Sequence, residues 1–447
     1  MPPLGMPLTN VKFTFNTAGV AGLLGSKEAI SATATVHLYA GRRWLGWYNS
    51  PASHSVARHF GRVARWCLWR VIFPGPRDSL AVLLGLDGEQ GPKFVTFLSG
   101  RMLDTQYLGH LTMKRSKEMK PEEIPGPRET TSSFVAYLSL SMAPTDDSAV
   151  LVVKQLPLRK RAFICPLIPI TTSAVTCIMC ALSYDWGSFA AILIGILAGG
   201  YASLVIGNGK LVIKCGKRPE RPGHGILMEK NEVMVIKGRE QDIRAITEGR
   251  FDIQMDPDQG EEETVPNHTD IGICSLFLFL QSIAQLLLVS QGTLFGQIMF
   301  LLSVAVSWWY NAYLSSLEVE EVQTKILFDE LGNPQIQRFR TYTWTTNTVF
   351  ACLLLLHGEM LSSSEEDHER LDRILRACIQ NDAPAWQRWR EKVIQQLLDT
   401  NKGSKELTHL EDAEEKDELS DNGVLLRYLL EDARVAFEKY FEIRNKL

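Results

Sequence analysis

Two cysteines, Cys177 and Cys180, have the C-x-x-C spacing that serves thiol redox chemistry or metal binding in soluble proteins. They lie, however, deep inside an apolar run without charged residues. A thiolate is costly there, and a metal ion would lack further ligands. The other cysteines are scattered and form no disulfide or zinc pattern. We therefore interpret this pair as packing residues, and we expect neither a metal ion nor a cofactor.

A glycine-rich segment at residues 19–27 invites comparison with a phosphate-binding loop. In such a loop a glycine is followed five residues later by Gly-Lys-Ser/Thr, but here Lys27 comes directly after Ser26. The chain also lacks a G-x-G-x-x-G that opens a helix, an H-E-x-x-H and a G-x-S-x-G. These patterns give no candidate catalytic residue.

Small residues in one apolar run favour close helix packing. Gly195 and Gly199 are four residues apart, so they lie on one face of a helix, with Gly200 beside them. Such a small-xxx-small pair lets a partner helix approach closely in a membrane. We therefore predict that Gly195 and Gly199 are helix-packing residues.

Glutamines occupy a second apolar stretch. Gln281 and Gln285 share a helix face, and a turn at residues 291–293 would place Gln285 level with Gln297 and Gln281 level with Ser303. Hydrogen bonds between these levels would hold two helices together, at about 1 kcal/mol each. The alternative is a polar lining for a solute pathway. We favour the packing role for Gln281, Gln285 and Gln297.

The elements that carry these residues are four segments without a charged side chain: residues 162–182, 188–207, 271–290 and 294–314. A helix that crosses the bilayer core needs about 20 mostly apolar residues. The connections within each pair are short, which predicts two antiparallel hairpins. Four buried helices of a soluble core are the alternative, but buried helices of this length rarely lack every charge. The sequence therefore predicts a multi-pass integral membrane protein.

Basic residues flank the first hairpin and predict its orientation. The turn between its two helices contains only Asp185, whereas both outer ends are basic. By the positive-inside rule, both outer ends face the cytosol, and so do both chain termini. The N-terminal residues show no cleavable signal peptide, so we expect internal segments to provide membrane attachment. The basic residues are Lys154, Arg159, Lys160, Arg161, Lys210, Lys214, Lys217 and Arg218.

The remaining chain predicts a mixed fold with three cytosolic regions. Residues 1–161 form a basic α+β domain, with 20 Lys and Arg against 11 Asp and Glu. Residues 208–270 form a small insert that ends in an acidic linker, and residues 315–447 form an acidic, mainly helical region with 17 Lys and Arg against 26 Asp and Glu. The membrane hairpins then cover residues 162–207 and 271–314. The expected strands are Lys93–Leu98, Ser133–Met142, Ala149–Leu156 and Gly225–Lys237, and the expected helices after the spans include Glu318–Leu331, Glu365–Ile379, Ala385–Leu398 and Leu425–Arg444.

A basic amphipathic helix is predicted over residues 53–73. Its apolar face would be lined by residues such as Val56 and Phe60, and the arginines lie on another face near tryptophans. Such a helix can lie in the membrane interface, or it can pack on a protein core. The interfacial candidates are Arg58, Arg62, Arg65, Trp66 and Trp69.

Three functions remain open from the sequence. The first is a membrane-anchored scaffold or interaction protein that binds the bilayer and protein partners. The second is a channel or transporter subunit, although no Asp, Glu, Lys, Arg or His lies inside a predicted span. The third is an enzyme at the membrane surface. We expect no nucleic-acid partner, and self-assembly stays open. The aromatic and basic segment 42–48 stands out, but no activity can be attached to it.

Overall fold

The computed structural model describes residues 25–63, 71–74, 79–140, 150–157, 164–214, 223–254, 269–359, 361, 364–411 and 421–444. The chain divides into two compact units. The first contains residues 1–88, 150–213 and 251–326, and the second contains residues 89–149, 214–250 and 327–447. Each unit is built from segments that lie far apart in the sequence, because the chain passes between the units several times.

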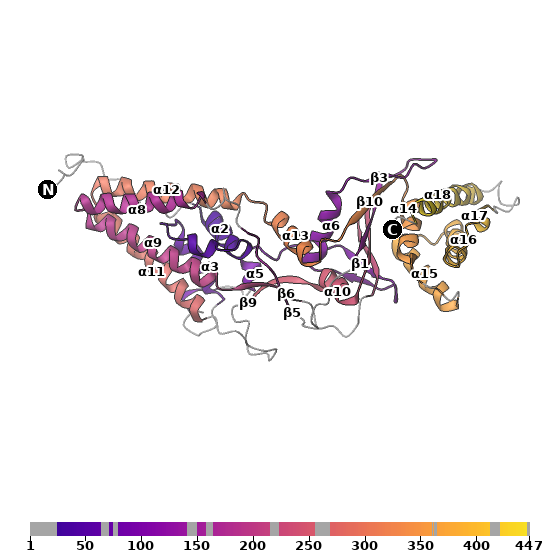
Figure 1. Ribbon diagram of the computed structural model, residues 1–447, viewed down its shortest axis with the longest axis horizontal. Coiled ribbons are helices and arrows are strands. Elements are labelled where there is room, and N and C mark those ends of the chain that lie inside the picture. Colours follow the sequence, from indigo (N-terminus) through magenta and orange to yellow (C-terminus); the bar gives the residue numbers. More distant parts are fainter. Residues whose placement is uncertain are drawn as a thin grey trace. The chain divides into compact units, whose positions relative to one another are not determined.

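The first unit is built on four apolar helices (Figure 1). Three of them, α9 (Trp186–Ile206), α11 (Thr269–Gln291) and α12 (Leu294–Ser315), are long and apolar enough to cross a membrane. The fourth, α8 (Leu167–Leu182), has 16 residues and is shorter than the predicted span over residues 162–182. Prolines explain the late start of α8: Pro166 is its N-cap residue, and Pro169 lies in its first turn, where missing N–H donors are tolerated.

The helices of the second hairpin separate from each other. α11 packs against α9, and α12 packs against α8, whereas α11 and α12 touch only slightly. N-terminal elements fill the space between them. α2 (Ser26–Leu38) packs on α12, α3 (Ser53–Gly61) packs on α11, and α2 and α3 touch each other. Figure 1 shows α2 and α3 between α12 and α11. Part of the predicted N-terminal cytosolic region therefore packs among the apolar helices.

Short elements complete the first unit. The 3₁₀ helix η1 (Arg42–Leu45) precedes the segment that contacts α9, and α5 (Leu80–Leu83) follows α3 in the sequence. A small sheet has the order β5-β6-β9, formed by β5 (Val150–Val152), β6 (Lys210–Lys214) and β9 (Arg250–Gln254). The helix α13 (Val319–Glu330) follows α12, as predicted over residues 318–331.

The second unit contains a seven-stranded mixed sheet of order β2-β1-β7-β8-β4-β10-β3. β4 and β8 run parallel, and the neighbouring pairs β1–β7, β7–β8 and β4–β10 run antiparallel. The sheet combines strands from the N-terminal region, the insert and the C-terminal region. Its strands are β1 (Lys93–Thr96), β2 (Met102–Asp104), β3 (Glu122–Glu123), β4 (Ser133–Ser139), β7 (Gly225–Glu229), β8 (Glu232–Lys237) and β10 (Ile336–Thr341).

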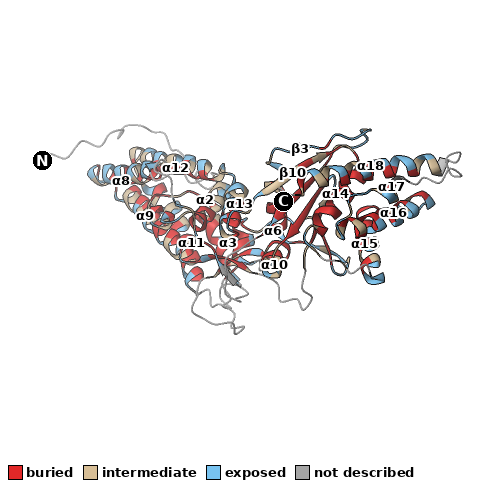
Figure 2. Cartoon of the chain, turned by 45° about the vertical axis from the view of Figure 1, so that its right-hand side comes forward, coloured by how far each residue is buried: buried red, intermediate tan, exposed pale blue. Residues whose placement is uncertain are grey.

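Helices cover both faces of this sheet (Figure 1). α14 (Trp344–Leu356) lies on one face; its residues 345–356 are buried, and residues 349–356 share one hydrophobic core with Val135, Val233 and Phe339. The same core includes residues of α15 (Glu365–Cys378), α16 (Pro384–Asn401), α17 (Thr408–Glu411) and α18 (Asp421–Ile443). On the opposite face lies α6 (Tyr107–Lys117), which contacts α10 (Glu240–Glu248). Figure 2 shows how much of this sheet is buried.

The alternation of residues along β8 explains the two layers. Val233 and Val235 point into the core shared with α14, whereas Glu232 points to the other face. There the Glu232 carboxylate accepts a hydrogen bond from Ser116 Oγ of α6 at 3.1 Å and pairs with Arg338 of β10 at 3.2 Å. Glu232 and Arg338 thus form an ion pair beneath α6.

Candidate functional site: a polar cavity in the helical unit

The glycine face of α9 receives the aromatic segment 46–49. A Cβ at Gly195 would lie 2.0 Å from Asn49 Oδ1, and a Cβ at Gly199 would lie 2.7 Å from the backbone oxygen of Tyr48. A Cβ at Gly200 would lie 2.2 Å from the ring of Trp47. These separations are too short for any side chain. The small residues therefore admit a non-helical segment, in contrast to the partner helix expected from the sequence.

Asn49 connects three of the apolar helices. Its backbone N–H donates to Ser173 Oγ of α8 at 3.1 Å. Its Oδ1 accepts a hydrogen bond from Gln285 Nε2 of α11 at 2.9 Å, and the same Nε2 lies 3.1 Å from the backbone oxygen of Ala191 on α9. Gln285 thus bonds Asn49 and the backbone of α9, not Gln297.

The other two predicted glutamines behave differently from each other. Gln297 Nε2 donates to the backbone oxygens of Val289 and Gly292 at 3.3 and 3.2 Å, which closes the turn between α11 and α12. Gln281 is 2% exposed, and neither its Nε2 nor its Oε1 has a hydrogen-bond partner in the described part of the chain. Ser303, its expected neighbour, bonds Ser173 at 3.1 Å. The cross-hairpin pairs do not form because α11 and α12 separate.

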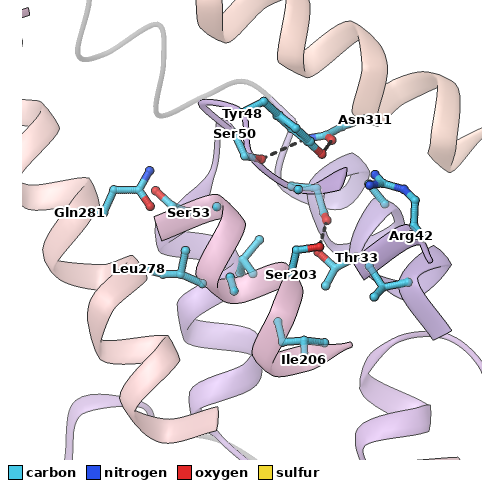
Figure 3. A pocket seen from close by; sticks show the side chains of 17 residues that line it. Thr33, Arg42, Tyr48, Ser50, Ser53, Ser203, Ile206, Leu278, Gln281 and Asn311 are labelled. Carbon is cyan, nitrogen blue, oxygen red and sulfur yellow. Dashed lines mark hydrogen bonds between the residues drawn. The ribbon is translucent and has the colours of Figure 1, made fainter. Parts of the chain in front are cut away.

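A cavity of about 60 Å³ lies beside this network, enclosed by α2, residues 42–56, α9, α11 and α12 (Figure 3). One part of its wall is polar: Tyr48 donates to Asn311 Oδ1 at 2.8 Å, and Asn311 Nδ2 donates to Ser50 Oγ at 3.2 Å. The volume exceeds what one water needs but is far below that of a pocket for a drug-sized ligand. Its lining is Ala29, Ala32, Thr33, Val36, Arg42, Gly46, Tyr48, Ser50, Ser53, Val56, Gly199, Ala202, Ser203, Ile206, Leu278, Gln281 and Asn311.

Arg42 brings a buried positive charge to this wall. The residue is 4% exposed, and its guanidinium lies 5.3 Å from the ring centre of Tyr310. Its Nε and Nη1 have no hydrogen-bond partner among the described residues. No Asp or Glu lines the cavity. The cavity therefore combines an uncompensated guanidinium with the two unsatisfied amide atoms of Gln281.

A second polar junction joins the turns of the two hairpins. Asp185, which is 4% exposed, accepts a hydrogen bond from Ser188 N at 3.0 Å and caps α9. Its other oxygen accepts hydrogen bonds from Thr293 N at 2.7 Å and Thr293 Oγ1 at 2.6 Å. Thr293 is in turn the N-cap of α12. One carboxylate thus fixes the starts of α9 and α12 side by side.

Only part of the predicted interfacial helix can be placed. α3 ends at Gly61, and the positions of Arg65, Trp66 and Trp69 lie outside the described residues. Arg58 is exposed and Arg62 is half-buried. Val56 and Phe60 are buried, and the exposed His54 contacts Phe279 of α11. α3 therefore packs on protein, while an interfacial role for Arg58 and Arg62 stays a prediction.

A group of titratable side chains lies at the end of β8 in the second unit. Lys237 pairs with Glu359 at 3.1 Å and donates to the backbone oxygen of His357, and His224 lies 3.4 Å from Glu359. His357 Nδ1 and the Tyr440 hydroxyl are 3.1 Å apart. Burial lowers the pKa of His224 and His357. Since these bonds stay within the unit, we interpret the group as an anchor between β8 and the helices.

The cysteines carry no reactive arrangement in the described ranges. Cys177 and Cys180 are buried in a hydrophobic cluster with Ala191 and Ile192, as expected for packing residues. In the second unit, burial raises the pKa of the Cys378 thiol to about 12, so it stays protonated. The residues that the structure describes contain no group of His, Cys, Asp and Glu that could hold a metal ion.

His37, at the end of α2, gives the first unit a pH dependence. It is fully buried with Nδ1 3.1 Å from the backbone oxygen of Gly209, and burial lowers its pKa to about 4. Because an unfolded histidine titrates near 6.5, acid favours the unfolded state. This contribution to stability is complete above pH 6.5 and falls as the pH approaches 4. At pH 5 we expect a loss of about 2 kcal/mol relative to pH 7.5.

The measurement is chemical unfolding of the detergent-solubilised protein and of His37→Gln at pH 7.5 and 5. The glutamine amide can still donate to Gly209 but does not titrate. The variant should lose less stability on acidification than the unchanged protein. Equal losses in the two proteins would show that His37 does not titrate on unfolding.

Comparisons with known proteins add no further constraint on this site, because the chain matches no family model, no curated protein and no solved structure.

Proposed function

We propose that the chain is a multi-pass integral membrane protein in which α8, α9, α11 and α12 cross the bilayer as two hairpins. The observation that carries this proposal is the apolar surface of these helices. Large apolar side chains stay exposed along all four, and soluble proteins rarely expose such contiguous apolar surface. They include Val175, Ile178, Met179, Leu193, Leu197, Ile273, Phe277, Leu280, Leu287, Ile298, Leu302 and Trp309.

The shortness of α8 is compatible with this placement. Its 16 residues extend about 24 Å, against a hydrocarbon thickness of about 30 Å. A helix slightly shorter than the bilayer is accommodated by local thinning, at a modest cost. The exposed side chains of α8, such as Ile168, Ile178 and Leu182, have the same lipid-compatible character as those of the longer helices.

The Asp185 junction supports one shared orientation for both hairpins. Because Asp185 joins the turn between α8 and α9 to the start of α12, both hairpin turns lie at one end of the helices. The basic flanks of the first hairpin then assign the opposite ends, and both chain termini, to the cytosol. The second hairpin has no charge bias of its own, so it takes its orientation from the first.

We propose further that the protein is a membrane-anchored interaction protein, with the second unit on the cytosolic side. The packing of α2, α3 and residues 46–49 among the apolar helices favours this role over a channel or transporter subunit. Gln285 and Gln297 are used in internal bonds, and the cavity that Gln281 lines is too small for a solute pathway.

The membrane proposal is tested by carbonate extraction of membranes from cells that express the full chain. We expect the protein in the pellet, and we expect protease added to sealed vesicles of cytosol-outward orientation to cleave the second unit. Release of a monodisperse, water-soluble protein by carbonate would contradict the proposal.

The interaction role is tested by crosslinking the full chain in mild detergent. Reconstituted protein that conducts ions in liposomes would favour the channel reading.

A charge on the lipid-facing side should disturb membrane insertion. Leu280 lies on α11 and is 52% exposed, and Arg at such a position costs about 2.5 kcal/mol. We expect Leu280→Arg to lower the carbonate-resistant fraction and the yield of folded protein. Leu98→Arg, at a 58% exposed position in the second unit, is the matched control and should leave both unchanged. Equal behaviour of the two variants would show that lipid does not surround α11.

A further inference from the structure

The cavity in the first unit contains a charge that nothing on the described chain neutralises. A guanidinium stays protonated at every physiological pH, and a buried charge without a partner is strongly unfavourable. The contact with the Tyr310 ring compensates Arg42 only in part, since cation–π contacts contribute about 1–2 kcal/mol. A bound anion would supply the missing counter-charge.

The other polar groups around the cavity suit an oxyanion. Gln281 Nε2 is a buried donor without a partner, and the hydroxyls of Ser53 and Ser203 belong to the same lining. Figure 3 shows Gln281 on α11 and Arg42 on the opposite side of the cavity, with Ser53 and Ser203 between them. Arginine donates charge-assisted hydrogen bonds to phosphate oxygens, and Nε and Nη1 of Arg42 have no partner among the described residues.

The location of the cavity suggests the source of the oxyanion. It is lined by Ser203 and Ile206 in the last turn of α9 and by Asn311 near the end of α12, the ends proposed to face the cytosol, and it extends to Gln281 near the middle of α11. Apolar side chains, among them Val56 and Leu278, complete the wall. A small polar site with an apolar border, near the end of membrane helices, fits a phosphate group that carries a glyceryl and acyl portion.

We propose that this cavity binds a phosphate-type oxyanion through Arg42 and Gln281, and that its source is the headgroup of an anionic phospholipid. A volume of about 60 Å³ accommodates the phosphate group itself, while the rest of the lipid lies outside. The phospholipid source rests on the proposed membrane location. Binding of the oxyanion by Arg42 does not, so carbonate extraction and anion binding can fail separately.

The test measures binding to the full chain in a neutral detergent, with the apparent melting temperature as readout. The probes are dihexanoyl phosphatidic acid, sodium phosphate and, as a lipid without phosphate, dioctanoyl glycerol. We expect a saturable rise in melting temperature with phosphatidic acid and none with the diglyceride. A response to phosphate equal to that with phosphatidic acid keeps the site but assigns it to a free anion, which overturns the lipid source.

Variants connect the response to the cavity. Arg42→Gln should weaken phosphatidic acid binding about 10- to 100-fold, the effect of losing charge-assisted hydrogen bonds. Arg43→Gln is the matched control: Arg43 is next in the chain, bonds Asn208 Oδ1 at 3.2 Å, and does not line the cavity. Gln281→Leu should weaken binding several-fold without lowering the melting temperature of the ligand-free protein.

Two results would overturn the proposal. One is the absence of a saturable response to phosphatidic acid and to phosphate in the unchanged protein. The other is equal affinity of the unchanged protein and Arg42→Gln for phosphatidic acid. Because Arg42→Gln removes a buried charge without a partner, the ligand-free variant is expected to fold, and its melting temperature confirms this. If Arg42→Gln does not fold, the affinities of Gln281→Leu and Arg43→Gln for phosphatidic acid still test the proposal.

Discussion

Asp185→Ala is expected to lower the free energy of unfolding of the detergent-solubilised protein by about 4 kcal/mol. The carboxylate accepts three hydrogen bonds, from Ser188 N, Thr293 N and Thr293 Oγ1, and the residue is 4% exposed. The two bonds from Thr293 to this charged acceptor contribute at least about 1.5 kcal/mol each, and loss of the N-cap bond from Ser188 costs about 1 kcal/mol more. Truncation leaves these donors without a partner at the starts of α9 and α12.

The close packing around Asp185 limits repair by neighbouring side chains. A Cβ at Gly296 would lie 2.1 Å from Asp185 Oδ2, and one at Gly292 would lie 2.3 Å from Ser188 Oγ. The two turns thus meet over glycines, with little room for another acceptor to move in. Chemical unfolding at fixed detergent concentration measures the effect.

Two further variants show whether the effect comes from acceptor oxygens. Asp185→Asn keeps one acceptor but turns an NH₂ group toward a donor, so we expect an intermediate loss. Asp270→Ala removes an exposed carboxylate from the first turn of α11. The interaction of this carboxylate with the helix dipole contributes less than about 1 kcal/mol to the free energy of unfolding. If Asp185→Ala cost no more than Asp270→Ala, the junction would not stabilise the protein.

The long apolar helices could be predicted from the sequence because length and composition suffice for them. α9, α11 and α12 agree with the predicted ranges to within a few residues. The length of α8 was overestimated because the predicted span began at residue 162, whereas the helix begins after Pro166. α2 was missed because Ala and Thr provide most of its buried face, and such small residues give a weak periodic signal.

Several apolar strands were predicted, whereas the apolar strand β6 and the more polar strands were missed. β1, β4 and β5 lie inside predicted strands, and the expected strand at Gly225–Lys237 forms the β7–β8 hairpin. β10 was missed because Arg338 and Arg340 interrupt it. Arg338 is accommodated in the sheet because its guanidinium lies over the Phe134 ring and pairs with the Glu232 carboxylate. That environment depends on residues about 100 and 200 positions away, which local patterns cannot supply.

The cavity could not be predicted because its residues come from five separate segments. The sequence showed the small-residue face of α9 and the aromatic, basic segment 42–48, but it did not show that one fills the other. A signal was present, because a helix face of small residues that admits a close partner needs a partner. Asn49 and Asn311 give no signal in local sequence, because each is significant only through the bonds it makes across the unit.

Gly199→Leu is expected to lower the free energy of unfolding by more than about 3 kcal/mol. Even a Cβ at this position would lie 2.7 Å from the Tyr48 backbone oxygen and 3.2 Å from that of Gly46. Backbone atoms cannot turn aside as a flexible side chain can. The leucine must therefore move residues 46–49 away from α9, which breaks the bonds of Asn49 to Gln285 and Ser173.

The same displacement should open the cavity, because Gly46, Tyr48 and Gly199 all line it. We therefore expect Gly199→Leu to lose both stability, measured by chemical unfolding, and the melting-temperature response to phosphatidic acid. Gly199→Ala should give a smaller loss of about 1–3 kcal/mol. Leu197→Phe enlarges a 47% exposed side chain on the same helix and should change neither quantity. If Gly199→Leu and Leu197→Phe were equally stable, residues 46–49 would not pack against α9, and the cavity between them would not exist as described.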